Sequence, residues 1–466
     1  MIDPRESSTL ALIPAPNALL GAVLLALAMI IGGGGSTAPL SELALELSAA
    51  FVSLAWIWMK GRPSLASAPR SCWVIVSLLV AIPLVQLIPL PPALWHHLPG
   101  HETERTALAL VGQADSWRPW SVQPSRTCAA LLSLGPCIMV MLITAQLDRD
   151  GQTQVVAMVA VIGMIAIFVG TAQVAAGDNA AFRFYGARSG DLEGFQANRN
   201  HAADVLLIAM VAFASSAREW RQRLHRGTTG PAFPAAVIGV SGLFAVAVVV
   251  TSSRAGVAML PLSLLGVLLL VRPWLKIDRR YAWLLALVGA IAVLAGAGVV
   301  RHNHVLARVA ARFTLDQEFR PRIWEDSLYA VRLYFPFGSG MGTFVPVFQA
   351  VERLENVDIF LTNRAHNDYL ELAIEGGLAG IAALLACGAL IVRAAAKAIA
   401  QTPGKSPALV IFALVTLCVI ALHSLVDYPL RTMSLQCLAG LAVGLLASAR
   451  KSRQPHVARD ITPLHE

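Results

Sequence analysis

LTNRAHNDYLELAIEGGLAG, residues 361–380, joins a polar cluster directly to the start of an apolar segment at about 376–392. The cluster combines a guanidinium, an imidazole, an amide and three carboxylates. Polar side chains at the mouth of a membrane helix are costly to keep there unless they are used. The stretch therefore predicts a membrane protein whose functional site lies where a helix enters the bilayer.

The composition also indicates a membrane protein. Hydrophobic residues make up 56% of the 466 residues and charged residues only 14%, whereas a soluble domain averages about 25% charged residues. Apolar runs of about 17–23 residues recur along the chain, which is the length that crosses a bilayer as a helix. The short alternating segments of a transmembrane barrel are not visible in the sequence. We therefore expect an all-α polytopic membrane protein.

These runs predict about twelve transmembrane helices. The first is taken as an uncleaved helix rather than a signal peptide, because no convincing cleavage site follows it. All six cysteines fall inside predicted spans and are interpreted as small apolar residues rather than disulfide or zinc ligands. The spans are about 15–34, 40–59, 71–92, 127–146, 154–175, 200–217, 233–250, 255–271, 281–300, 376–392, 406–425 and 432–449.

Basic residues in the short loops predict the orientation. The side that collects them is expected to be cytoplasmic and to hold both termini, so the loops at about 93–126, 176–199 and 301–375 face outward. The chain then divides into spans one to nine (1–300), the outer loop or lid that carries the site, and spans ten to twelve with a cytoplasmic tail (376–466). The basic residues are Lys60, Arg62, Arg70, Arg218, Arg221, Arg223, Arg226, Arg272, Lys276, Arg279, Arg280, Arg393, Lys397, Lys405, Arg450, Lys451, Arg453 and Arg459.

The large outer loop between spans nine and ten is long enough to form two or three short helices lying on the outer surface. Pro321 is placed to open a helix through IWEDSLYAVRLY, and FPFGSGMGTF ends it. A second helix is predicted at about 344–356. The apolar face of the first helix is predicted to contain Ile323, Trp324, Leu328 and Val331.

His366 is the predicted catalytic base. An ordinary imidazole has a pKa of about 6.5, so it can accept a proton at neutral pH. Asn367 and Asp368 are candidates to orient this base or to bind substrate, and Arg364 is a third candidate for substrate binding.

The alternative interpretation of this cluster is a polar helix cap at the membrane surface, in which Glu371 and Glu375 are simply solvated. A metal site formed by His366, Asp368 and these glutamates matches no standard ligand spacing. We therefore predict no metal at this position.

Arginines at the outer ends of the predicted helices are candidates for binding an anion. Arg254, in TSSRAG at 251–256, lies in a very short connection between two apolar runs. Placing an arginine near the bilayer core costs about 3 kcal/mol or more, which favours a functional role. The alternative is an interfacial arginine that reaches the lipid headgroups.

Two other places carry such arginines. Arg199, within GFQANRNHAADVLL, precedes a span, and Asp204 inside that span is predicted to pair with Arg199 or Arg254. Arg320 and Arg322 begin the predicted lid helix, where anions bind well. Helix capping and ordinary solvated charges are the alternatives.

Three further motifs carry weaker signals. GSGMG, 338–342, contains glycines that allow backbone amides to approach a phosphate, although a flexible turn is the simpler interpretation. DRD, 148–150, resembles an acidic metal-binding pair but falls on the predicted cytoplasmic side. In SLVDYPLR, 424–431, Asp427 and Arg431 have the spacing of a local salt bridge.

Taken together, these motifs resemble the O-antigen ligase and O-antigen polymerase superfamily. The resemblance rests on HNDYLELAIEGGLAG, on RPRIW and FGSGMGTF in the long outer loop before it, and on TSSRAG, NRN and SLVDYPLR. It covers most of residues 120–449. The motifs of ligases and polymerases overlap, so the resemblance does not separate the two activities.

The resemblance implies a C-type glycosyltransferase-like membrane fold that acts at the periplasmic face of the bacterial inner membrane. It implies a glycan donor on undecaprenyl diphosphate and a saccharide or lipid A-core acceptor, with membrane lipids as surroundings. His366 corresponds to the family's outer-loop histidine and Arg254 to its intramembrane arginine, while Arg199 and Arg322 are further correspondences. No metal, nucleotide sugar or nucleic acid is expected.

A transporter or flippase for the same lipid-linked glycan is the alternative from another class. A transporter places its charged site near the midplane, on interrupted helices. Here the charges concentrate at the predicted outer face, and no matching pair of broken helices is visible. The sequence therefore favours a metal-independent, inverting transferase with a histidine base and arginines that hold the diphosphate.

Overall fold

The computed structural model describes residues 16–34, 39–60, 67–176, 183–185, 191–224, 232–275, 320–357, 361–401 and 407–448. The predicted span 281–300, residues 301–319 of the predicted outer loop and both chain termini lie outside the described residues.

Helices occupy the positions of the other eleven predicted spans, which confirms an all-α polytopic membrane protein. Among the described residues, seven helices are long and apolar enough to cross a membrane: α2 (Pro39–Lys60), α6 (Pro124–Thr144), α7 (Arg149–Ala176), α8 (Arg199–Leu224), α9 (Ala232–Val250), α10 (Arg254–Val271) and α15 (Asp368–Ala400). Four apolar helices are shorter: α1 (Pro16–Ile31), α3 (Arg70–Gln86), α16 (Ala408–His423) and α17 (Met433–Ala447).

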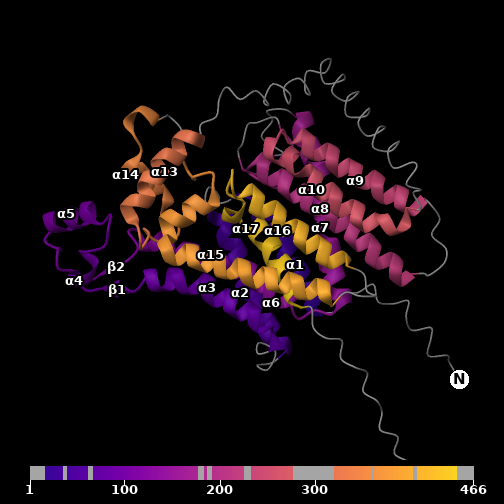
Figure 1. Ribbon diagram of the computed structural model, residues 1–466, viewed down its shortest axis with the longest axis horizontal. Coiled ribbons are helices and arrows are strands. Elements are labelled where there is room, and N and C mark those ends of the chain that lie inside the picture. The colour runs from indigo at the N-terminus through magenta and orange to yellow at the C-terminus, as the bar shows by residue number, and fades with distance from the viewer. Residues whose placement is uncertain are drawn as a thin grey trace, which may run out of the picture.

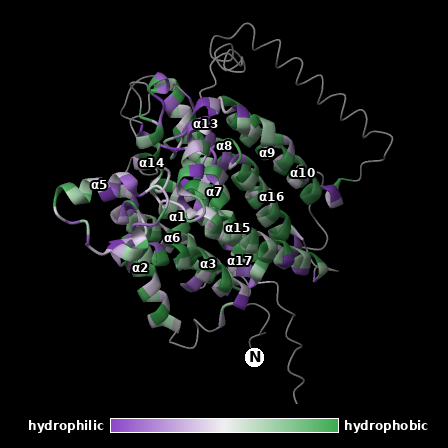
Figure 2. Cartoon of the chain, turned by 60° about the vertical axis from the view of Figure 1, so that its left-hand side comes forward, coloured by the Kyte–Doolittle hydropathy of each residue, from purple (hydrophilic) through white to green (hydrophobic). Residues whose placement is uncertain are grey.

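Helix α8 forms the centre of the bundle and packs against α7, α9, α10 and α16. Its sequence permits this position, because small residues such as Ala203 and Ala209 let neighbouring helices approach closely. Gly163 of α7 and Gly256 of α10 lie directly against these two alanines. Hydrophobic residues predominate in the helices around it (Figure 2). The polar residues in the first turns of α8 are therefore carried into the interior of the protein.

A small unit, which we call the cap, lies at one end of the bundle (Figure 1). Its two parts are far apart in sequence, but Trp120 Nε1 donates a hydrogen bond to the Gly338 carbonyl at 3.1 Å and Thr127 Oγ1 donates to the Met341 carbonyl at 2.8 Å. The elements of the cap are β1 (Pro89–Leu90), α4 (Pro92–Trp95), α5 (Glu102–Leu110), β2 (Arg118–Pro119), α13 (Arg320–Tyr334), α14 (Phe344–Val351) and the 3₁₀ turn η6 (Leu354–Asn356). Strands β1 and β2 pair antiparallel, with Leu90 opposite Arg118.

Helix α13 begins where the proline predicts, but its buried face differs from the prediction. Leu328 is 51% exposed, so its assignment to the apolar face was wrong. Ile323 and Val331 do pack against the buried cluster of the cap, as predicted. The fully buried stripe beside them contains Ser327, Ala330 and Tyr334, together with Asp326. Asp326 is stable there because Arg353 Nε donates to it at 2.7 Å, a compensation that hydrophobic periodicity does not reveal.

The opposite end of the bundle contains a network of arginines. Arg149 makes a bidentate pair with Glu219, at 2.7 and 2.8 Å, and Arg223 pairs with Asp150 at 2.7 Å. Asp148 accepts a hydrogen bond from the amide of Gly151 and so caps the start of α7. Arg149 and Asp150 of the DRD motif thus tie α7 to α8, and the structure favours this role over a metal site.

We predict that the cap faces the periplasm and the arginine-rich end faces the cytoplasm, because short loops rich in basic residues remain cytoplasmic. A phosphatase reporter fused after residue 345, within α14, should be active. The same reporter fused after Ser448 should be inactive. Ser448 directly follows α17, and its hydroxyl donates to the Leu445 carbonyl. Equal activity at both positions would contradict the predicted orientation.

Candidate active site

Four segments that the sequence singled out meet at the cap end of the bundle. His366, just before α15, lies with Nδ1 3.2 Å from Oδ1 of Asp427, in the connection between α16 and α17. Asn200, in the first turn of α8, donates from Nδ2 to the other oxygen of Asp427. Ser253, just before α10, donates from Oγ to Oδ1 of Asn200 at 2.8 Å. A chain of hydrogen bonds therefore joins four of the quoted motifs.

His366 has a left-handed backbone conformation with φ of 51°, which costs energy for a residue other than glycine. The backbone is fixed on both sides. Trp324 Nε1 of α13 donates to the Ala365 carbonyl at 2.9 Å, and the Ala365 amide donates to Oε2 of Glu371 at 3.2 Å. Asn367 caps α15. This conformation holds the imidazole against Asp427 while 28% of the side chain stays exposed.

Asp427 is fully buried and ionised. Burial raises its pKa, but the hydrogen bond with His366 and the neighbouring imidazoles outweigh burial and hold the pKa below the ordinary range. The amide of Tyr428 also donates to Oδ1, at 3.0 Å. An ionised carboxylate only accepts hydrogen bonds, so the hydrogen between the two residues belongs to Nδ1 of His366. Nε2 of this ring is then free to accept a proton.

A buried cluster of charges lies beside this pair. Asp368, Glu371 and Glu375 are spaced along one face of α15, and Arg431 lies among them, in the 3₁₀ turn η7 (Pro429–Arg431). Its guanidinium is 2.9 Å from Glu375, 3.3 Å from Glu371 and 3.6 Å from Asp368. Arg364 Nη1 donates to Glu371 at 2.8 Å. Burial lowers the pKa of Arg431, but the three carboxylates raise it above its ordinary value.

This cluster corrects one expectation and rules out one alternative. Arg431 does not pair with Asp427, because η7 turns Arg431 towards α15 while Asp427 faces His366. Glu371 and Glu375 are not solvated, since both are fully buried. In each case the partner comes from another segment of the chain, which spacing along a single segment does not predict.

Three residues predicted to bind substrate have partners within the protein. Asp368 accepts from the Ser424 hydroxyl at 2.8 Å and from the Leu430 amide at 3.0 Å. Asn367 donates to the Leu425 carbonyl at 3.0 Å, and Arg364 is only 12% exposed beside Glu371. These contacts hold the loop of His366 against the connection between α16 and α17. A direct role in substrate binding stays a prediction for all three.

The predicted arginines lie at helix starts at the cap end. Arg254 is the first residue of α10, and Ser253 caps this helix by accepting from the Gly256 amide at 3.0 Å. Arg199 begins α8 and pairs with Asp191 at 3.0 Å, with 37% of its side chain exposed. Arg320 and Arg322 lie in the first turn of α13, where Arg322 is exposed.

Asp204 pairs with neither arginine, contrary to the sequence prediction. Its Oδ1 lies 2.6 Å from Nδ1 of His423, the last residue of α16, and both side chains are fully buried. Sequence reasoning missed His423, Asn200 and Ser253 as parts of the site. Each of these residues is a polar side chain within or beside an apolar helix, and this feature could have marked it as a candidate. The partner of each residue depends on how the helices pack.

GSGMG forms a joint with α15 rather than a phosphate loop. Helix α15 is broken at Gly377, where φ is 54° and ψ is −146°. The Gly340 amide donates to the Glu375 carbonyl at 3.0 Å, and the Leu378 amide donates to the Pro336 carbonyl at 2.8 Å. A side chain at Gly338 would meet the Glu375 carbonyl at 2.6 Å. The glycines thus allow the cap to satisfy the backbone groups that the break exposes.

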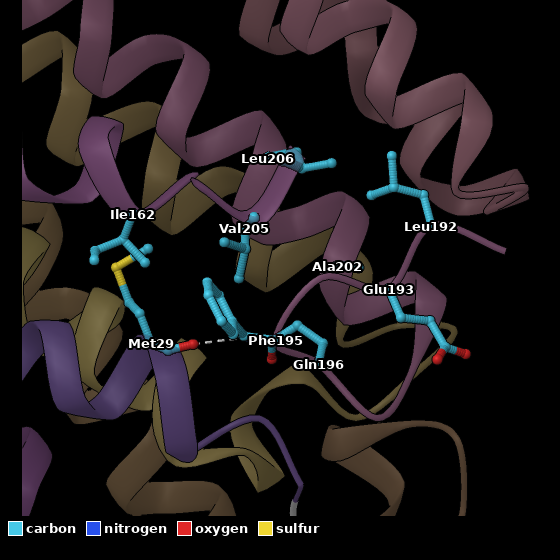
Figure 3. A pocket seen from close by; sticks show the side chains of 10 residues that line it. Met29, Ile162, Leu192, Glu193, Phe195, Gln196, Ala202, Val205 and Leu206 are labelled. Carbon is cyan, nitrogen blue, oxygen red and sulfur yellow. Dashed lines mark hydrogen bonds between the residues drawn. The ribbon is translucent and has the colours of Figure 1, made fainter. Parts of the chain in front are cut away.

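A small hollow lies near α1, α7 and α8, under residues 192–196 (Figure 3). Its walls are mostly apolar, and Glu193 points away from it to pair with Arg183 at 3.0 Å. Gln173 binds the overlying segment by donating to the Gly194 carbonyl at 2.8 Å. The hollow therefore lies beneath the docked segment that carries Asp191, the partner of Arg199, and offers no acid–base group.

Comparison with protein families supports the resemblance seen in the sequence. The family model described as O-Antigen ligase (Wzy_C) matches residues 239–385. The match includes Arg254, the second part of the cap, His366 and the break in α15. A search of curated proteins finds no match.

We predict that Arg431→Ala destabilises the protein strongly, by about 3–5 kcal/mol, because it leaves buried carboxylates without their counter-charge. The thermal unfolding midpoint of the purified protein in detergent measures this loss. Adding Glu375→Gln to Arg431→Ala should restore part of the lost thermal stability, because it removes one of the buried carboxylates left without a counter-charge. Arg126→Ala, at an exposed arginine whose Nε donates to Gln123, is the control. An unchanged midpoint for Arg431→Ala would show that the cluster does not hold the fold.

Proposed function

We propose, from its membership of the O-antigen ligase and polymerase superfamily, that this chain transfers a glycan from undecaprenyl diphosphate to a hydroxyl of a saccharide acceptor. The observation that carries the proposal is the pair of His366 and Asp427, a partly exposed imidazole on a buried carboxylate at the end of a membrane bundle. The acceptor is another saccharide chain for a polymerase, or lipid A-core for a ligase.

His366 acts as the general base. Its Nδ1–H donates to Asp427, so Nε2 takes the proton as the acceptor hydroxyl attacks the anomeric carbon. The acceptor O–H bond breaks, a new bond forms between that oxygen and the anomeric carbon, and the bond from this carbon to the diphosphate oxygen breaks. One displacement of this kind inverts the anomeric configuration. Asp427 stabilises the imidazolium that forms, as the buried carboxylate does in a serine protease triad.

Arginines hold the leaving diphosphate. Arg254 is the central one, because it lies at the start of an 18-residue helix, where the free backbone amides also favour an anion. Ser253, beside it, is hydrogen-bonded through Asn200 to Asp427. Arg199, Arg320 and Arg322 provide further positive charge at the same end. Fixed positive charges stabilise a leaving diphosphate without a metal ion.

The transporter alternative is less well supported. A transporter uses the free backbone groups of a broken helix to hold its cargo. In α15 the groups at the Gly377 break are bonded by the cap, and Gln86 Nε2 donates to the Glu375 carbonyl as well, at 2.9 Å. The break therefore supports a fixed joint that holds the cap over α15.

His366→Ala should lower turnover by roughly 10²–10⁴-fold, because it removes the base. The assay uses purified protein in lipid and the native lipid-linked glycan, extracted from cells that lack this protein and accumulate it. His97→Ala, at an exposed histidine near α4, should keep wild-type turnover. Near-normal turnover of folded His366→Ala at saturating acceptor would leave His366 as a positioning residue only.

Arg254→Ala should lower turnover roughly 10²–10³-fold, because one preorganised charge on the diphosphate is lost. It should also weaken binding of undecaprenyl diphosphate without glycan, measured by thermal stabilisation of the purified protein. Arg254→Lys should recover only part, since lysine lacks the planar fork. Arg105→Ala, at an exposed arginine of α5, is the matched control. If Arg254→Ala binds the carrier and turns over normally, Arg254 does not hold the diphosphate.

A further inference from the structure

Buried acids and imidazoles alternate beneath His366. From the interior outward, the column consists of Asp204, His423, Asp427 and His366. Nδ1 of His423 lies 2.6 Å from Asp204, and its Nε2 lies 4.0 Å from Asp427. The inner three side chains are fully buried. In the displacement proposed above, only His366 and Asp427 have an assigned role. Asp204 and His423 have none so far.

The charges of this column have to balance inside the protein. Two buried carboxylates close together are costly unless a cation lies between them. In the part of the chain that the structure describes, the ion pairs of Asp204 and Asp427 are made with histidines. A protonated His423 lies between both carboxylates and leaves the column with one net negative charge. Proton transfer to His366 then brings that charge to zero.

Building on the proposed displacement, we propose that Asp204 and His423 are positioning residues that keep Asp427 ionised and so set the tautomer of His366. An ionised Asp427 accepts the hydrogen on Nδ1 and leaves Nε2 free. A positive His423 adds to the groups that keep Asp427 ionised, and without it the balance at this buried carboxylate moves towards a bound proton. A protonated Asp427 donates to Nδ1, so a neutral His366 carries its own hydrogen on Nε2, where it blocks acceptance of a proton.

The geometry offers a substitution that separates charge from packing. Asp204→Asn keeps the shape and an oxygen that accepts from Nδ1 of His423, but removes the negative charge that favours a protonated His423. The buried bridge between α8 and α16 thus remains while the charge pattern changes. Thr416→Val on α16 is the matched control, because Thr416 is fully buried on the same helix and lies outside the column.

The test is a double-mutant cycle with the extracted native donor described above. Asp204→Asn should lower kcat roughly 10- to 100-fold, the range typical for partners that orient a metal-binding imidazole, with acceptor KM unchanged. If Asp204 acts through Asp427, the double variant Asp204→Asn/Asp427→Asn should be no slower than Asp427→Asn alone. Thr416→Val should resemble the wild type. An unchanged kcat, a change in KM alone or multiplicative losses would overturn the proposal.

Histidine nitrogen NMR of the wild-type protein provides a second readout that needs no active variant. With ¹⁵N-labelled histidine, His423 should be doubly protonated and His366 should carry its hydrogen on Nδ1, with assignment from His423→Gln and His366→Ala. A neutral His423 would overturn the proposal. The two hypotheses fail differently: an active His366→Ala refutes the displacement, whereas an inactive His366→Ala with a normal Asp204→Asn refutes only the role of the column.

Discussion

The need to compensate buried carboxylates on α15 determines the architecture of the site. Three acidic side chains occupy one face of this helix, and two of them are fully buried. Removing one partner from such a cluster costs about 3–5 kcal/mol, so Arg431 and Arg364 are required to stay in place. Arg431 binds the connection between α16 and α17 to α15, and Arg364 binds the loop before α15 to the same helix. His366 lies between these two attachments, which explains how its left-handed backbone is held.

The cap extends the same constraint across the site. Its α13 fixes the loop through the bond from Trp324 to the Ala365 carbonyl, and its glycine-rich segment fills the break at Gly377. Asp427 then receives hydrogen bonds from three directions, including Asn200 of the central helix. Segments from most of the chain thus converge on one imidazole. A side chain held so firmly loses little conformational freedom on reaction, which is the benefit that a preorganised site would give the proposed base.

The sequence predicted the helices well, because apolar runs of bilayer length are a signal carried by each segment alone. It also singled out His366, since this residue lies in the polar cluster at a helix mouth, and its catalytic role stays a prediction. It did not predict partners. Asp427 was assigned to Arg431 and Asp204 to an arginine, whereas the true partner of each lies on another segment of the chain. The rule that buried charges are paired or hydrogen-bonded shows that partners exist for these residues, but only packing decides which they are.

The central claim, that His366 is a base held by Asp427, is tested most directly by chemical rescue. His366→Gly suits the site because glycine adopts a φ of 51° without strain, and the partly exposed position admits a small molecule. The variant should lose turnover, and added imidazole should restore it in proportion to the concentration of the neutral form. Near wild-type turnover of His366→Gly without imidazole would contradict the account.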